Sequence, residues 1–231
     1  MNAIVLSALW GVVMMFSGLF SKSNTTVRVI AITGLSALLI ANILEMNGIR
    51  FFDIDVRNMM VFDNFSLLFN AIAFAACLVY FLLSGRDFEK VGTNVAEYYA
   101  LIFFVLCGIG IASSFNTLLM LFLGIEIISI PLYILTGSDK RNLKSNEASL
   151  KYFLMGCFST GLMLMGITLI YGVKGSFSMD VISIGKGALT PMMTAGLLLL
   201  FFSMAFKVSA VPFHFWAPHV YDGAPTVFTS F

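Results

Sequence analysis

Residues 205–218 read AFKVSAVPFHFWAP, and this stretch decides the kind of fold that the chain adopts. It follows TAGLLLLFFSM at residues 194–204, so Lys207 stands inside an apolar run, with Pro212 five residues after it. A run of this length and apolarity is typical of a membrane-spanning helix. A charge within such a helix usually faces the interior of a bundle or a wet cavity. The stretch therefore predicts a membrane helix with a buried amine beside a proline.

The composition of the whole chain agrees with this interpretation. Of its 231 residues, 59% are hydrophobic and 11% are charged, whereas soluble domains have about 45–50% apolar and 25% charged residues. The net charge of +1, without a basic patch, argues against nucleic acid as a partner. We interpret the chain as an integral membrane protein whose surroundings are the lipid bilayer.

Seven apolar runs are long enough to cross a bilayer, which takes about 20 residues. They span residues 3–20, 27–46, 65–84, 97–114, 116–136, 148–172 and 191–216, and an eighth begins near Thr226. The first run lacks the basic region and cleavage site of a signal peptide, so we expect it to be retained. The runs predict one all-α transmembrane domain over residues 1–231. An apolar run that is cut off at Phe231 leads us to expect a truncated chain.

Between the second and third runs, residues 51–57 (FFDIDVR) alternate apolar and charged side chains. A period of two is typical of a β-strand. We therefore predict a short strand hairpin on the membrane face.

Lysine and arginine are unevenly distributed among the links. The links after the first, third and fifth spans carry seven of them, and those after the second, fourth and sixth carry four. Because cytoplasmic loops are enriched in these residues, we expect the first set in the cytoplasm and the N-terminus outside it.

Three ionisable residues lie inside apolar runs, where a charge costs about 2.5–3.5 kcal/mol on insertion scales. Glu126 is ten residues from either end of its run, about 15 Å of helix, too far for a carboxylate to reach the interface. Lys207 lies near mid-depth if its helix continues past Pro212, and it can snorkel outward if the helix stops there. Lys151 lies about one turn inside its run. Its side chain can either extend to the membrane surface or have a function inside the bundle.

Glu126 and Lys207 share a second feature, because each precedes a proline, Pro131 or Pro212, by five residues. A proline in a helix leaves the carbonyl four residues back without its hydrogen bond, and in lipid a neighbour, a serine or water must replace it. Both helices should therefore bend and admit water beside a group that can exchange a proton.

The freed carbonyls belong to Ile127 and Val208, and Ser129 and Ser209 lie between charge and proline in the two helices. These serines are the residues nearest in sequence that could satisfy them. We treat Pro131 and Pro212 as candidate hinges.

The two histidines follow Lys207. His214 lies seven residues after it, on about the same helix face, and an imidazole can pass protons near neutral pH. It is a candidate relay, and the alternative is an interfacial histidine beside Trp216. His219 falls in a link, where we expect a solvated surface residue.

The sequence lacks nucleotide-binding and zinc-protease motifs, and its three cysteines lie in separate apolar runs without metal-ligand spacing. We therefore expect no covalent chemistry, no metal and no cofactor bound by this chain. The buried charges instead indicate transport.

Three segments resemble the antiporter-like subunits of respiratory complex I, and among these the subunit N type. They are FKVSAVPFHFWAPHVYDGAPT (206–226), LGIEIISIPLYIL (123–135) and EASLKYFLMGCFSTG (147–161), similar to the family's seventh, fifth and sixth helices. The resemblance runs from about Asn64 to the end, and the first two spans fit by hydropathy. The sister subunits M and L and the cation/proton antiporters usually differ around the proline and after the tryptophan.

The resemblance implies a fold of about fourteen helices in two inverted five-helix repeats, each with a proline-interrupted helix, of which this chain would hold the first. The family's proton-handling glutamate and lysine correspond to Glu126 and Lys207, and its sixth-helix lysine to Lys151. His219 departs from the family, which usually has an acidic residue at that position, and this leaves any role of the link residue open.

The resemblance also implies a proton-translocating subunit of NADH:quinone oxidoreductase, a translocase, in the bacterial inner membrane. Its partners would be the other membrane subunits of complex I, and NADH, FMN, iron–sulfur clusters and quinone would belong to the complex rather than to this chain. The alternatives are a subunit of a sodium/proton antiporter and a membrane scaffold whose charges fix helix register.

Overall fold

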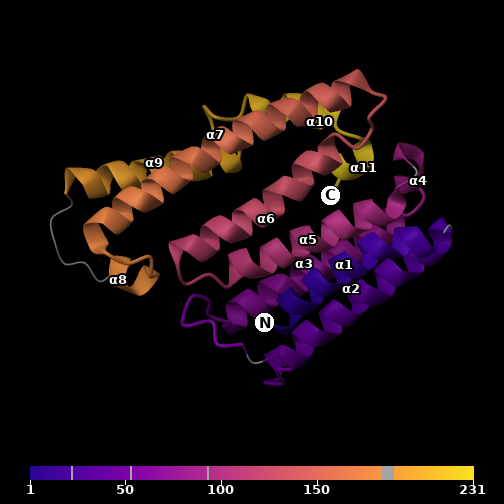
Figure 1. Cartoon of the computed structure of the whole chain (residues 1–231), viewed down its shortest axis with the longest axis horizontal. Helices are drawn as coiled ribbons and strands as arrows, with labels where there is room; N and C mark the ends of the chain where they lie inside the picture. Colours follow the sequence, from indigo (N-terminus) through magenta and orange to yellow (C-terminus); the bar gives the residue numbers. More distant parts are fainter. Residues whose placement is uncertain (22, 53, 93, 184–189) are drawn as a thin grey trace.

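A computed structural model describes residues 1–21, 23–52, 54–92, 94–183 and 190–231, and in these residues the chain is an all-helical bundle (Figure 1). Six helices are long and apolar enough to cross a membrane: α1 (Asn2–Phe20), α2 (Asn24–Met46), α3 (Asn64–Ser84), α5 (Val95–Ser113), α6 (Leu118–Thr136) and α7 (Leu143–Lys174). The remaining helices are α4 (Phe88–Val91), α8 (Met179–Ser183), α9 (Pro191–Lys207), α10 (Trp216–Gly223) and α11 (Thr226–Thr229). The chain is thus a multi-pass membrane protein.

Polar residues at the helix ends determine where several of the apolar runs become helical. Asp63 accepts a hydrogen bond from the backbone N–H of Ser66 at 2.8 Å and so begins α3. The same bond keeps the pKa of Asp63 below its usual value. Thr117 and Thr190 begin α6 and α9 in the same way. These caps satisfy amide groups that a helix start leaves unpaired.

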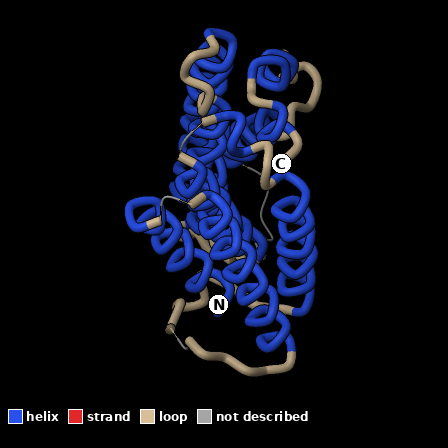
Figure 2. Tube along the Cα trace, turned by 90° about the vertical axis from the view of Figure 1, so that its right-hand side faces the viewer, coloured by secondary structure: helices blue, strands red, loops and turns tan. Residues whose placement is uncertain are grey.

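The helices form two groups that meet at α6. Helices α1, α2, α3 and α5 lie together on one side, and α7 and α9 lie side by side on the other (Figures 1 and 2). The first group has an aromatic core in which Phe81 and Tyr99 meet edge to face with ring centroids 4.8 Å apart. Helix α6 contacts α5 on one side and α7 on the other, so it lies at the boundary between the groups.

Helices α7 and α9 approach each other closely through small residues. A Cβ at Gly166 would lie 2.8 Å from the carbonyl oxygen of Gly196, and a Cβ at Gly196 would lie 3.0 Å from that of Gly166. The hydroxyl of Ser159 donates to the carbonyl of Ser203 at 3.0 Å, and that of Ser203 donates to the carbonyl of Ser159 at 2.8 Å. Small residues and interhelical hydrogen bonds are the means by which helices associate in lipid. The position of α9 is therefore fixed by α7.

The strand hairpin predicted at residues 51–57 is wrong. The described residues of this segment form no strand (Figure 2), although isolated bridges join Met60 to Phe115 and Thr117 to Ser178. The backbone N–H of Phe51 donates to the Oδ1 of Asn2 at 2.9 Å rather than to a partner strand. Arg57 has a positive φ of 47°, which interrupts an extended backbone.

The predicted span at residues 191–216 is also wrong in extent. Helix α9 ends at Lys207, residues 208–215 form a non-helical link, and α10 begins at Trp216. Ser209, with a φ of 56°, marks the change of direction. The apolar run is continuous in sequence, but hydropathy does not register this turn of the backbone.

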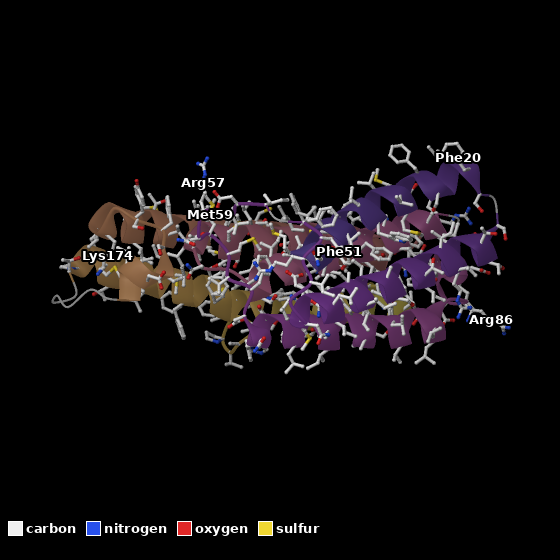
Figure 3. The ribbon with its side chains drawn as sticks, turned by 90° about the horizontal axis from the view of Figure 1, so that it is seen from below. Phe20, Phe51, Arg57, Met59, Arg86 and Lys174 are labelled. Atoms are coloured by element: carbon white, nitrogen blue, oxygen red, sulfur yellow. The ribbon has the colours of Figure 1, made fainter. Side chains whose placement is uncertain are left out.

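Labelled residues at three of the links lie toward opposite ends of the bundle, with Phe51 and Arg57 of the link after α2 between them (Figure 3). Figure 3 places Phe20 and Arg86 near one end and Lys174 near the other. The separation agrees with an assignment of alternate links to the two sides of a membrane. Lys22 and Lys186, which entered the charge comparison, lie outside the described residues, as does Asp53 of the predicted hairpin.

We predict that Gly166→Leu will destabilise the protein by more than about 1–3 kcal/mol, the usual cost of overpacking, because its side chain would have to displace the backbone of α9. Gly161→Leu is the control, since this exposed glycine of the same helix has nothing within 4 Å of its Cβ position. Thermal unfolding in detergent measures both. Equal melting temperatures for the two variants would contradict the close approach of α7 and α9.

Candidate functional site

Two of the three charges predicted inside the bilayer meet at the boundary between the two helix groups. The Nζ atom of Lys207, on α9, lies 3.4 Å from the Oε1 atom of Glu126, on α6. Their side chains are 15% and 21% exposed, respectively, so most of both is removed from solvent. Lys207 therefore turns toward α6 and does not extend outward along its own stem.

Two neutral residues of α6 complete the surroundings of the amine. Lys207 donates to the Ser129 hydroxyl at 3.0 Å and to the Tyr133 hydroxyl at 3.4 Å, in addition to Glu126. Glu126, Ser129 and Tyr133 stand at positions i, i+3 and i+7, which share one face of a helix. An ammonium group has three donors, and this face offers one acceptor to each.

Glu126 has a further partner on the other helix group. The Thr160 hydroxyl of α7 lies 2.7 Å from the Oε1 atom of Glu126 and 3.0 Å from the carbonyl oxygen of Gly156. The carboxyl group thus contacts both α7 and α9. A change in the distance between the helix groups would change both contacts.

The end of α9 favours a cation at this place. Lys207 is the last residue of α9, where the final carbonyl groups of a helix give it a partial negative charge. One of these carbonyls, that of Phe206, accepts a hydrogen bond from the Nε1 of Trp216 at 3.1 Å. The break after Lys207 therefore leaves the amine at a helix end, and Trp216 of α10 packs on Phe206 next to it.

The two prolines have different surroundings. Pro131 is buried within α6, which continues through it to Thr136. Ser129 donates to the carbonyl of Ile125 at 2.7 Å. Pro212 lies in the non-helical link after α9. The prediction that Pro212 frees the carbonyl of Val208 assumed a helix that continues through the proline. It does not apply, because α9 ends before this residue.

Lys151 and the histidines lie apart from this ion pair. Lys151 pairs with Glu147 at 2.5 Å, and its side chain is 43% exposed. His219, on α10, lines a small pocket with these two residues, near a second pair in which Lys144 lies 3.6 Å from Asp222. His214 is exposed in the link after α9, so the argument that it shares a helix face with Lys207 is wrong.

Sequence reasoning missed Tyr133 and Thr160. The position of Tyr133, seven residues after Glu126, was a usable signal because it repeats the helix face of the carboxyl group. Thr160 gave no such signal, since it belongs to another helix whose rotation the sequence does not specify.

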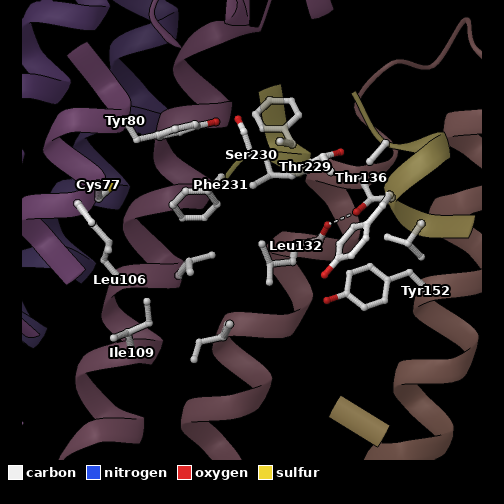
Figure 4. Close-up of a pocket in the computed structure, with 18 of the residues that line it drawn as sticks. Cys77, Tyr80, Leu106, Ile109, Leu132, Thr136, Tyr152, Thr229, Ser230 and Phe231 are labelled. Atoms are coloured by element: carbon white, nitrogen blue, oxygen red, sulfur yellow. Dashed lines mark hydrogen bonds between the residues drawn. The ribbon is translucent and has the colours of Figure 1, made fainter. Parts of the chain in front are cut away.

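A larger cavity, of about 600 Å³, lies beside the site and is mostly apolar (Figure 4). Helices α3, α5 and α6 line it together with the C-terminal segment. Tyr152 lies at its edge, and the Tyr80 hydroxyl donates to the carbonyl of Val227 at 2.8 Å. Glu126 and Lys207 are not among the described residues that line it.

The part of the chain that holds this ion pair has a counterpart among known proteins. Residues 115–231 match the family described as NADH:quinone oxidoreductase/Mrp antiporter, transmembrane. The chain belongs to this family. The predicted resemblance is thereby confirmed.

Individual members of the family extend the match across the chain. NADH-quinone oxidoreductase subunit N of Cytophaga hutchinsonii is 42% identical over 234 residues, which cover 100% of this chain and 50% of the relative. The similarity thus includes the first two helices, for which the sequence gave only hydropathy. The chain spans about half the length of the curated relatives it matches.

Two solved structures share the fold. A chain of respiratory complex I from Thermus thermophilus with bound aureothin aligns with a TM-score of 0.78 and 28% identity, covering 98% of this chain and 48% of its own. A chain of the Mrp complex from Dietzia sp. DQ12-45-1b aligns with a TM-score of 0.76 and 18% identity, covering 100% of this chain and 46% of its own. The second likeness shows the fold alone. The all-helical, antiporter-like fold class is confirmed.

We predict that Glu126→Leu will lower stability by about 1–3 kcal/mol, since it leaves the ammonium of Lys207 without its charged acceptor. The double variant Glu126→Leu/Lys207→Met should recover most of this loss, because it replaces both charges with apolar groups. Thermal unfolding in detergent compares the two. A double variant less stable than the single one would show that the pair does not bond as described.

Proposed function

We propose that this chain forms part of a membrane-arm subunit of NADH:quinone oxidoreductase and translocates protons through Glu126 and Lys207. The observation that carries the proposal is the 3.4 Å contact between an acid on α6 and an amine on α9. The 42% identity to a subunit N over the whole chain supports this assignment over other members of the family.

The electrostatics of the pair suit a proton-transfer step. Two unit charges 4 Å apart attract by about 4 kcal/mol at an effective dielectric constant of 20. In contact, the carboxylate and the ammonium stabilise each other. When they separate within a poorly solvated interior, each is more stable in its neutral form, so the acid takes up a proton and the amine releases one. Alternate separation and contact, with access from opposite sides, would move protons across the membrane.

The remaining candidate residues have subsidiary places in this proposal. Lys151, with Glu147, would hand protons between the surface and the pair, and His214 would act as a relay in the link. Pro131 and Pro212 would be the hinges. The energy would come from partner membrane subunits of complex I, and NADH, FMN, iron–sulfur clusters and quinone would be bound elsewhere in the complex.

Two alternatives are a sodium/proton antiporter subunit and a structural scaffold. The Mrp complex shares this fold, which is the observation in favour of the first. An antiporter would respond to a sodium gradient without NADH. A scaffold would keep transport when the charges are neutralised.

We predict that Lys207→Ala and Glu126→Ala will each leave assembly largely intact and reduce NADH-driven proton pumping at least tenfold. A loss of about 1.4 kcal/mol in the step that the pair stabilises is sufficient for this factor. Quenching of a pH-sensitive dye in membrane vesicles measures pumping, relative to the amount of assembled complex.

Lys90→Ala and Asp87→Ala are the matched controls. These two residues also form an ion pair, 2.6 Å long, but their side chains are 76% and 51% exposed. Exposed pairs contribute little, so pumping should stay at the wild-type level. Full pumping in an assembled Glu126→Ala/Lys207→Ala variant would reject the proposal.

We also propose that the N-terminus lies outside the cytoplasm, in a bacterial inner membrane. The excess of Lys and Arg in alternate links supports this orientation. Cysteines introduced singly at Arg86 and at Lys174, in a background with Cys157 replaced, should label from the cytoplasmic and the outer side, respectively, with a membrane-impermeant maleimide. The reverse pattern would contradict the orientation.

A further inference from the structure

We propose that Tyr133 is a positioning residue for Lys207, and that Gly156 provides the space in which its hydroxyl reaches the amine. The inference rests on the proposed function, since it concerns how the same site keeps its charge during transport. It gives Tyr133 and Gly156 a role in transport that neither the sequence patterns nor the similarity to known proteins indicates.

Tyr133 is buried, and its ring packs against α7, which α10 supports in turn. The side chain is on α6, and its ring meets that of Tyr152, on α7, edge to face, with centroids 4.6 Å apart. Tyr152 in turn stacks on Trp216 of α10, with centroids 4.8 Å apart and planes 10° from parallel. The ring is thus confined, and its hydroxyl points to Lys207 at 3.4 Å.

Gly156 is what allows the Tyr133 hydroxyl to lie between α6 and α7. A Cβ at Gly156 would overlap this hydroxyl and would lie 2.6 Å from the ring carbon that bears it. The overlap involves the far end of the tyrosine side chain. An alanine would therefore displace the hydroxyl and leave the helix backbones in place. Gly156 and Tyr133 form one unit across the interface.

The hydroxyl has its effect when Glu126 is neutral or has moved away. Lys207 then retains two neutral acceptors, Ser129 and Tyr133, on the same face of α6. These keep the ammonium near the place where it meets the carboxylate. Without Tyr133, the charged amine in this state has one acceptor fewer in a poorly solvated interior, so it releases its proton more readily. Tyr133 therefore determines how long Lys207 remains charged after the pair opens.

The experiment uses Tyr133→Phe, Gly156→Ala, their double variant and Lys207→Ala in vesicles that contain the assembled complex. Tyr133→Phe keeps the ring against Tyr152 and removes the hydroxyl. Interhelical hydrogen bonds in membrane proteins average about 0.6 kcal/mol, which corresponds to a factor of about three. We expect Tyr133→Phe and Gly156→Ala each to lower proton pumping about threefold.

Two further readouts separate a positioning role from a structural one. The alkaline limit of pumping should move to lower pH in Tyr133→Phe. The double variant should pump no less than the weaker single one, because both changes remove the same contact. Gly161→Ala is the matched control, since its Cβ meets nothing within 4 Å, and it should pump as the wild type does.

The outcomes distinguish this inference from the proposed function. Loss of pumping in Lys207→Ala together with wild-type pumping and an unshifted pH profile in Tyr133→Phe overturns the inference alone. Multiplicative losses in the double variant also overturn it, since Gly156 would then act by another route. Full pumping in Lys207→Ala rejects the proposed function itself.

Discussion

An ammonium group and a carboxylate cannot be placed singly in the interior of a membrane protein without a large cost, and the arrangement of this chain follows from that constraint. Lys207 and Glu126 lie on different helices, so each charge requires that the other helix be in place. The hydroxyl groups of Ser129, Tyr133 and Thr160 satisfy the donors and acceptors that the pair leaves over. The result is a small polar centre enclosed by apolar helices.

The strength of the helix contacts differs around this centre. Helix α9 is fixed to α7 by reciprocal serine hydrogen bonds and by the approach of Gly166 and Gly196. Helices α5 and α6 are as close, since a Cβ at Gly108 would lie 2.9 Å from the carbonyl oxygen of Gly124. Between α6 and α7, by contrast, the contacts at the site consist of side chains. A boundary made of side chains can open by rotamer changes, whereas backbone contacts between glycines cannot.

The break after Lys207 serves the same centre. A helix that continued through residues 208–215 would place Lys207 in its interior, away from the partial negative charge of a helix end. Because α9 stops at Lys207, its final carbonyls favour a cation, and that of Phe206 accepts from both the Ser209 N–H and the Trp216 indole. Beyond the link, α10 packs against α7, and its Trp216 stacks on Phe206 near the end of α9.

The sequence by itself determined the class of the protein and the identity of its central pair. Hydropathy locates long apolar helices because lipid permits few spanning structures other than helices, and Glu126 and Lys207 are conspicuous because charges are rare there.

Tertiary structure decided what depends on the rotation and ending of helices. The two charges meet, Thr160 and Tyr133 join them, α9 ends at Lys207, and Lys151 pairs with Glu147. It also decided that the described residues of 51–57 form no strand, where the backbone N–H groups of Phe51 and Phe52 both donate to Asn2. Apolar runs show which segments enter a membrane, but only packing fixes where a helix ends within a run and which side of it faces which neighbour.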